Sequence, residues 1–309
     1  MLRYIVRRVL FLIPVLLGVA FCVFTLLYLT PGDPARMVLG DLATEDAVQE
    51  FRNREGLNDP FLVQFGNYVW KAVTKGDIGR SYVTKRSVAQ EVLAAFPATL
   101  KLSALAMLIA ILVGLPCGIL SAIKQYSLFD TVTMIFAMIG LSMPVFWLGL
   151  LLILLFSVHL RWLPSSGFGT FKAMILPAVS LSAQAISMVT RMTRSSMLEV
   201  IRADYIRTAR AKGQKEFVVI WVHALHNALI PVVTLCGLQF GHLLAGAILT
   251  ESIFAIPGIG RLMVSSIMQR NYPVVQGGVL FIAIAFSIVN LLVDLVYAYI
   301  DPRIKAQYK

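Results

Sequence analysis

Charged residues are scarce in this sequence. Only 14% of its 309 residues are Asp, Glu, Lys or Arg, whereas 58% are hydrophobic. A water-soluble protein of this length needs a far more charged surface, so the composition indicates a chain that crosses a membrane several times. Cysteine is scarce as well. Cys22, Cys117 and Cys236 all fall within apolar stretches, which favours ordinary packing over a disulfide framework or a metal site.

Sequence motifs for catalysis are also missing. The chain has no glycine-rich phosphate loop ending in Gly-Lys-Ser/Thr, so we expect it not to hydrolyse nucleotide by itself, and it has no His-Glu-x-x-His motif. His223 and His226 are three residues apart, but no carboxylate or cysteine stands beside them, and we therefore expect no metal. Within the apolar stretches His242 and Asp294 are ionisable, which is little for a proton relay.

Six stretches are long and apolar enough to cross a bilayer. They cover residues 9–29, 98–122, 131–157, 173–190, 228–250 and 277–300. The first follows three arginines, as a signal peptide does, but no small-x-small cleavage site follows it, so we expect an uncleaved helix. Pro144 permits a kink in the third stretch, and the small residues Gly114, Gly118 and Gly237 favour close helix packing.

The net charge of +11 reflects topology and lipid headgroups better than nucleic acid. If the N-terminus is cytoplasmic, fourteen basic residues fall on the inner side and four in the short outer loops. The fourteen are Arg3, Arg7, Arg8, Lys124, Arg191, Arg194, Arg202, Arg207, Arg210, Lys212, Lys215, Arg303, Lys305 and Lys309; the four are Arg161, Lys172, Arg261 and Arg270. The asymmetry predicts six helices with both termini in the cytoplasm.

The predicted fold is an all-α polytopic membrane protein with three parts. Residues 1–29 form the cytoplasmic N-terminus and first helix, residues 30–97 an extracytoplasmic insertion, and residues 98–309 a five-helix core. The insertion carries eight basic and nine acidic residues, and helical patterns are expected around 45–56 and 60–74. A small folded unit is expected there; a passive tether is the alternative.

The most informative stretch is the basic segment, residues 191–227, between the fourth and fifth apolar stretches. Gly213 is expected to divide it into two short helices, because glycine is costly inside a helix and tolerates a positive φ. An apolar stripe is expected from Tyr205, Ala209, Phe217, Ile220 and Trp221. From these residues alone, a surface for a partner protein and an amphipathic helix on anionic lipid are equally good interpretations.

Between Arg207 and Gly213 the chain reads Arg-Thr-Ala-Arg-Ala-Lys-Gly. This resembles the coupling-loop signature, Glu-Ala-Ala-x-x-x-Gly, of permease subunits of bacterial ABC importers, in the form found in the dipeptide, oligopeptide and nickel branch. Further matches to that branch run through nearly the whole chain: Pro31-Gly-Asp-Pro34, Gly76-Asp-Ile-Gly79, Arg191 to Val200, His223 to Pro231, Glu251 to Phe254, Pro257-Gly-Ile-Gly260, Tyr272 to Gln276 and Asp301-Pro-Arg303.

Two positions depart from the general signature. Arg207 stands where it has Glu, so a role that needs a carboxylate would pass to Glu199 or Asp204 or be absent. His226 stands where it ends in Pro. These departures concern individual docking contacts, not the location of the docking surface.

The resemblance implies a non-catalytic permease subunit in the bacterial inner membrane. It implies four kinds of partner: a second homologous permease, two cytoplasmic ATP-binding subunits that use ATP and Mg²⁺, an extracytoplasmic binding protein, and membrane lipid. The chain itself would bind no cofactor. The residues expected to dock the ATPase are Asp204, Tyr205, Arg207, Thr208, Ala209, Arg210, Ala211, Lys212 and Gly213.

The expected mechanism is alternating access, and the substrate implied by the resemblance is a short peptide, with glutathione and nickel as alternatives. Polarity at membrane depth suggests a translocation pathway that includes Ser142, Gln184, His242 and Asn290. The competing class is a stand-alone carrier driven by an ion gradient, which would depend on Asp294 or His242 and need no ATPase.

Overall fold

The structure is a computed structural model that describes residues 2–40 and 42–300. The predicted basic tail with Arg303, Lys305 and Lys309 lies outside the described residues. The side chains of Arg3, Arg7, Arg8 and Asp294 lie outside them as well. The described chain forms two compact units. The first unit is Leu100–Ile256 with the chain from Ile288 onward, and the second is Leu2–Thr99 with Pro257–Ser287.

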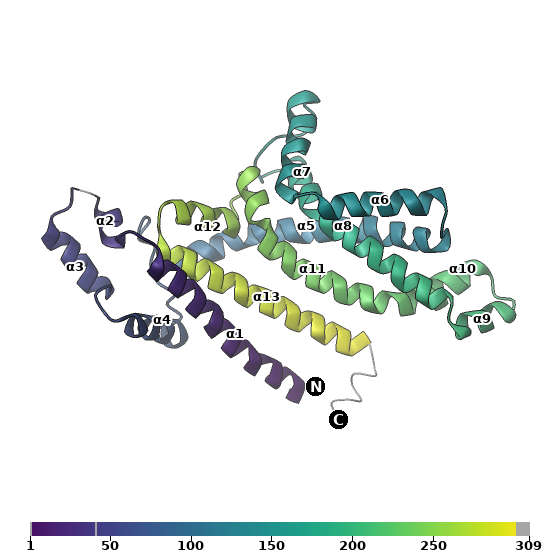
Figure 1. Ribbon diagram of the computed structural model, residues 1–309, viewed down its shortest axis with the longest axis horizontal. Helices are drawn as coiled ribbons and strands as arrows, with labels where there is room; N and C mark the ends of the chain where they lie inside the picture. The colour runs from purple at the N-terminus through teal and green to yellow at the C-terminus, as the bar shows by residue number, and fades with distance from the viewer. Residues whose placement is uncertain (1, 41, 301–309) are drawn as a thin grey trace. The chain divides into compact units, whose positions relative to one another are not determined.

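Every regular element in the described residues is a helix, which confirms the all-α prediction (Figure 1). Those before residue 124 are α1 (Leu2–Leu29), α2 (Pro34–Leu39), α3 (Glu45–Glu55), α4 (Phe61–Lys75) and α5 (Val88–Ile123). Next come α6 (Leu128–Ser142), α7 (Val145–Leu152), the π-helix η1 (Ile153–His159), α8 (Phe171–Ile201), α9 (Asp204–Ala211) and α10 (Glu216–Val218). The π-helix η2 (Val219–Ala224), α11 (Leu225–Ile253), α12 (Ile259–Met268) and α13 (Tyr272–Ile300) complete the order.

Five of the six predicted spans are long apolar helices, and the third is a bent pair. The kink that Pro144 permits in the third span is present and large, because α6 and the α7–η1 helix meet at an angle of 105°. Pro144 explains the break. A residue before proline is pushed out of the helical region, and Met143 is extended, with φ −79° and ψ 124°.

The first unit is built around α8, which packs against α6, α7 and α11. Serines buried in α8 donate hydrogen bonds to carbonyls of the preceding turn, as Ser180 does to Pro177 and Ser187 does to Ala183, both at 2.9 Å. The predicted close packing at Gly118 of α5 is confirmed. A Cβ atom there would stand 2.6 Å from the carbonyl oxygen of Thr190 in α8.

The second unit has two small apolar clusters. In the first, Ala35, Val48 and Phe51 join α2 to α3, and α3 confirms the predicted helix near 45–56. In the second, Val88 and Val92 of α5 pack with residues of α12 and α13. The Asn271 side chain links loops distant in sequence, because its Oδ1 accepts from the Tyr82 N–H at 2.9 Å and its Nδ2 donates to Ser81 Oγ at 2.8 Å.

Candidate functional site

Only part of the basic segment, residues 191–227, lies outside the two long helices that flank it. Residues 191–201 continue α8, and residues 225–227 begin α11, so only 202–224 stand between the two long helices. Figure 1 shows α9 and α10 as short helices beyond the ends of α8 and α11. The helix extends past residue 190 because no proline or glycine interrupts the chain between Ile201 and the end of the predicted span. The predicted start at 191 is therefore wrong as a boundary of structure.

Four buried side chains hold this stretch to the long helices. Ile206, Val219 and Ala224 are fully buried, and Ile220 nearly so. They share one cluster with Met197 of α8 and with Ile119 and Ala122 of α5. These contacts fix α9 and the residues after it to the ends of α5 and α8.

The predicted apolar stripe is wrong in part. Ile220 is buried, but Tyr205, Phe217 and Trp221 are 45%, 70% and 44% exposed. The buried side is instead built on Ile206 and Val219. A single helical wheel of 3.6 residues per turn fails here because the turn at Gly213 separates Tyr205 from the later residues, and because Trp221 lies in a π-helix, whose wider turn changes the direction of its side chain.

The turn at Gly213 matches its prediction. Gly213 has φ +74°, a left-handed conformation that side chains other than glycine rarely adopt, and it separates α9 from α10. Across the turn, Arg210 Nη2 donates to Glu216 Oε1 at 2.6 Å and Nε donates to Oε2 at 3.1 Å. This hydrogen-bonded pair raises the pKa of Arg210 above its usual value.

The residues predicted to dock a partner lie on the surface, with Ala209 half-buried among them. Arg207 and Asp204 form a weak pair at 3.6 Å with side chains 73% and 96% exposed. Beside them, the exposed rings of Phe217 and Trp221 lie 5.9 Å apart. The surface thus combines solvated charges with an aromatic patch, which is the composition typical of protein interfaces.

Two further features belong to this region. Tyr205 Oη accepts a hydrogen bond from Asn227 Nδ2 at 2.9 Å and so connects α9 to α11. The metal interpretation of His223 and His226 gains no support: within residues 2–40 and 42–300, no three His, Cys, Asp or Glu side chains are grouped to hold a metal ion.

One ion pair near the basic segment was missed by the sequence analysis. Arg194 of α8 makes two hydrogen bonds to Asp130 of α6, at 2.6 and 2.7 Å, and the Asp130 side chain is only 5% exposed. The Tyr126 N–H adds a third bond to Asp130 at 3.0 Å. The signal that could have found the pair is an acid at one end of a predicted span and an arginine just past the end of the next.

The four residues predicted to line a pathway come from four helices of the first unit. Ser142 ends α6 and is exposed, and His242 on α11 is exposed. Gln184 on α8 and Asn290 on α13 are half-buried. Their common role stays a prediction.

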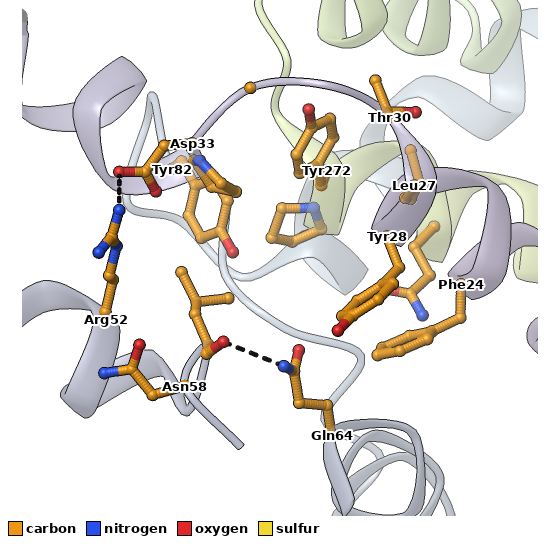
Figure 2. A pocket seen from close by; sticks show the side chains of 15 residues that line it. Phe24, Leu27, Tyr28, Thr30, Asp33, Arg52, Asn58, Gln64, Tyr82 and Tyr272 are labelled. Atoms are coloured by element: carbon orange, nitrogen blue, oxygen red, sulfur yellow. Dashed lines mark hydrogen bonds and ion pairs between the residues drawn. The ribbon is translucent and has the colours of Figure 1, made fainter. Parts of the chain in front are cut away.

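The second unit contains a cavity of about 440 Å³. Figure 2 shows Tyr28, Tyr82 and Tyr272 around it, with Arg52 paired to Asp33 at 2.8 Å. Burial tends to raise the pKa of Asp33, but hydrogen bonds from Arg52 and from backbone N–H groups outweigh it and lower that pKa below 3.8. Gln276 also lines the cavity; its side-chain nitrogen is buried and donates no hydrogen bond to the described protein groups. The cavity suits a polar, partly aromatic group.

Comparisons with known proteins agree with the helical architecture. Two family models cover the chain: residues 1–103 match the N-terminal part of a binding-protein-dependent transport system membrane component, and residues 114–306 match the binding-protein-dependent transport system inner membrane component. The MetNI methionine ABC transporter, in an inward-facing conformation, has the same fold over 69% of this chain and 97% of its own, with a TM-score of 0.59 and 18% identity.

Several relatives match over their full lengths. The dipeptide transport system permease protein DppB of Alkalihalophilus pseudofirmus is 45% identical over 99% of this chain and 100% of its own. The di/tripeptide permease DppB of Pseudomonas aeruginosa is 44% identical with the same coverage. The glutathione permease GsiC of Salmonella choleraesuis is 45% identical over 99% of both chains. The chain therefore belongs to the family of binding-protein-dependent transport system inner membrane components, as a non-catalytic permease subunit of an ABC importer.

Proposed function

We propose that this permease imports short peptides across the bacterial inner membrane. The observation that carries the proposal is the full-length similarity to permeases named for dipeptide and di/tripeptide transport. The construction of the basic segment supports a mechanical role, because its exposed charged face is fixed by buried side chains to α5 and α8. The chain supplies the membrane passage, and the energy comes from partner subunits.

The proposed assembly contains a second homologous permease, two cytoplasmic ATP-binding subunits and an extracytoplasmic binding protein, all in membrane lipid. ATP and Mg²⁺ act in the ATP-binding subunits, and this chain binds no cofactor. Both termini are proposed to be cytoplasmic and residues 30–97 extracytoplasmic, since the inner segments then carry fourteen basic residues against four in the short outer loops.

Transport is proposed to follow alternating access. Closure of the ATP-binding subunits pulls on the docking residues 204–213, and the buried Ile206 passes that movement to α5 and α8. Arg207 replaces the glutamate of the general signature, so Asp204 beside it, with a fully solvated carboxylate, is the candidate acid for the partner. The moving helices open a pathway proposed to include Ser142, Gln184, His242 and Asn290.

Glutathione is a second candidate substrate, and one observation favours it. The alignments to the two peptide permeases span 333 and 336 positions, more than the 309 residues of this chain, whereas the alignment to the glutathione permease spans 305. This chain thus has the length of the glutathione permease. Nickel and an ion-coupled carrier remain more remote alternatives.

The first test uses the chain purified gently from its own host with every protein that accompanies it. Stoichiometric recovery of an ATPase and a second permease supports the importer, and competition between radiolabelled dipeptide and glutathione for uptake separates the two substrates. A chain that purifies alone and moves solute in liposomes without ATP contradicts the proposal.

The mechanical role is tested by Gly213→Pro in the assembled complex. Proline fixes φ near −65°, which is incompatible with the observed +74°, whereas Gly213→Asn is a matched control because asparagine tolerates the left-handed region. Loss of substrate-stimulated ATP hydrolysis and of transport in the proline variant alone is expected. If both activities survive in Gly213→Pro, the basic segment does not transmit the movement.

A further inference from the structure

Helix α4 is more apolar than its packing requires. Its Phe61, Phe65 and Tyr68 pack against the aromatic side chains of Phe21 and Phe24 in α1, with ring centroids 5.3–6.3 Å apart. These contacts use only one side of the helix, and no residue of α4 is fully buried.

The apolar side chains continue around α4 beyond this contact. Leu62 is 71% exposed, Trp70 68% and Val73 77%. At 100° per residue they lie next to the packed rings and form one continuous apolar face, while Asn67 and Lys71 lie on the opposite face. An exposed apolar face of this size marks an interaction surface.

The contacts with α1 set the depth of α4. The apolar span of α1 is Leu10–Leu29, so at about 1.5 Å per residue Phe21 and Phe24 lie roughly 12 and 7 Å inside its end. A helix that packs on these two rings cannot stand above the bilayer in water. It lies at the depth where interfacial helices insert, about 5–10 Å into the boundary between headgroups and acyl chains.

The direction of α4 follows from the same contacts. Phe61, Phe65 and Tyr68 span two turns of α4, yet all three contact Phe24, and the first two also contact Phe21. Two helices that run alongside each other would show contacts advancing along both. Phe61 also contacts Tyr28, about one turn farther along α1, with ring centroids 5.0 Å apart, but Tyr68 returns to Phe24, so the three rings converge on Phe24 and α4 crosses the spanning helix.

We propose that α4 is an interfacial helix whose exposed apolar face, formed by Leu62, Trp70 and Val73, is covered by lipid. Lys71 and Lys75 on its polar side reach the phosphates of the headgroups, and Trp70 lies at the interface, where tryptophan is enriched. The lipid is continuous with that around α1, whose span is only 6% buried by protein. Only the assignment to the outer leaflet rests on the proposed function.

The test measures depth in the assembled importer, reconstituted in nanodiscs of phosphatidylethanolamine and phosphatidylglycerol. Cys22, Cys117 and Cys236 are replaced by alanine, and nitroxide labels are attached one at a time through Leu62→Cys, Val73→Cys and the polar-face control Asn67→Cys. Collision rates with oxygen, which concentrates in lipid, and with a water-soluble nickel chelate are compared at each position.

Labels at positions 62 and 73 are expected to collide mainly with oxygen, and the label at position 67 mainly with nickel. Equal access of nickel to all three overturns the proposal, because the face is then in water. Protection of 62 and 73 from both reagents also overturns it and shows that a protein subunit covers the face.

A second measurement keeps the native cysteines. Brominated lipid is expected to quench more tryptophan fluorescence in the unmodified chain than in Trp70→Phe; equal quenching contradicts the lipid contact. Labelling of Asn67→Cys with an impermeant maleimide on intact spheroplasts tests the proposed orientation separately. Failure to label would place α4 on the inner side and contradict the proposed topology, not the interfacial position.

Discussion

The basic segment and the insertion of residues 30–97 are both polar stretches between apolar helices, but they are held in opposite ways. The buried residues of the basic segment, such as Ile206 and Val219, pack against the long helices α5 and α8. The insertion instead buries Val48 and Phe51 against its own α2, within the second unit. The first construction fixes the segment to long helices, and the second is a local cluster of short helices.

Each region also has an arginine–carboxylate pair, and burial separates the two. Arg194 and Asp130 have side chains 23% and 5% exposed, whereas Arg52 and Asp33 are 34% and 20% exposed. Removing one partner is therefore expected to lower the free energy of unfolding much more for the Arg194–Asp130 pair than for the Arg52–Asp33 pair. A charge left without its partner is destabilising in proportion to its burial.

The largest effect is expected for Arg194→Ala. It leaves Asp130 buried without its cation, which costs about 3–5 kcal/mol when a buried pair loses one partner. The purified complex should melt at a clearly lower temperature in a thermal scan. The double variant Asp130→Leu/Arg194→Met should recover most of the loss, since apolar replacement removes the uncompensated charge. A melting temperature unchanged in Arg194→Ala would show that water reaches Asp130.

Ile206→Ala is expected to have the next largest effect, and it tests whether buried packing links α9 to the long helices. Removing a fully buried isoleucine costs about 2–5 kcal/mol of packing, here at the contact between α9 and the long helices. Amide exchange in α9 should accelerate, and substrate should no longer stimulate ATP hydrolysis.

Val48→Ala is the matched change in the insertion, where Val48 is equally buried. It should accelerate exchange in α3 and leave the stimulation of ATP hydrolysis intact. If both variants uncouple ATP hydrolysis to the same degree, the two regions are not mechanically distinct.

The sequence predicted the features of the two regions that depend on composition and on single residues. Apolar length identifies the spanning helices, and Gly213 marks a turn because its left-handed φ suits glycine. Helix signals also predicted α3, whose Thr44 accepts a hydrogen bond from the N–H of Ala47.

The sequence could not predict the features that depend on contacts between residues far apart in the chain. Asp130 and Arg194 are 64 positions apart, and nothing local indicates that α6 and α8 bring them together. The direction of Trp221 depends on the π-helical turn of residues 219–224 in which it lies, and apolar periodicity does not reveal that turn. Pro144 predicted a kink in the third span, but its 105° angle is set by the packing of α6 and α7 on α8.

A smaller effect is expected for Arg52→Gln. Because both side chains are partly solvated, the pair contributes about 1 kcal/mol or less. The folded state lowers the pKa of Asp33, so its contribution is present above the unfolded value of 3.8 and is lost as the pH falls through the lower, folded value. Amide protection of α2 and α3 should therefore differ between wild type and variant near neutral pH and converge once the pH has fallen through the lowered pKa of Asp33. A difference that persists in acid would mean that Arg52 acts by packing.

The smallest effect is expected for Glu216→Gln, which breaks the pair across the Gly213 turn. Its side chain and that of Arg210 are 57% and 39% exposed, and pairs this exposed contribute less than about 1 kcal/mol. Stability should hardly change, and the remaining difference should disappear in high salt, because screening removes exposed pairs first. The control is Arg207→Gln, which breaks the longer pair with Asp204 and should have the same melting temperature as Glu216→Gln. If Glu216→Gln lowered the melting temperature as much as Ile206→Ala, the ion pair, rather than buried packing, would fix the basic segment to its helices. The basic segment would then differ from the insertion in its ion pairing and not in the burial of its apolar side chains.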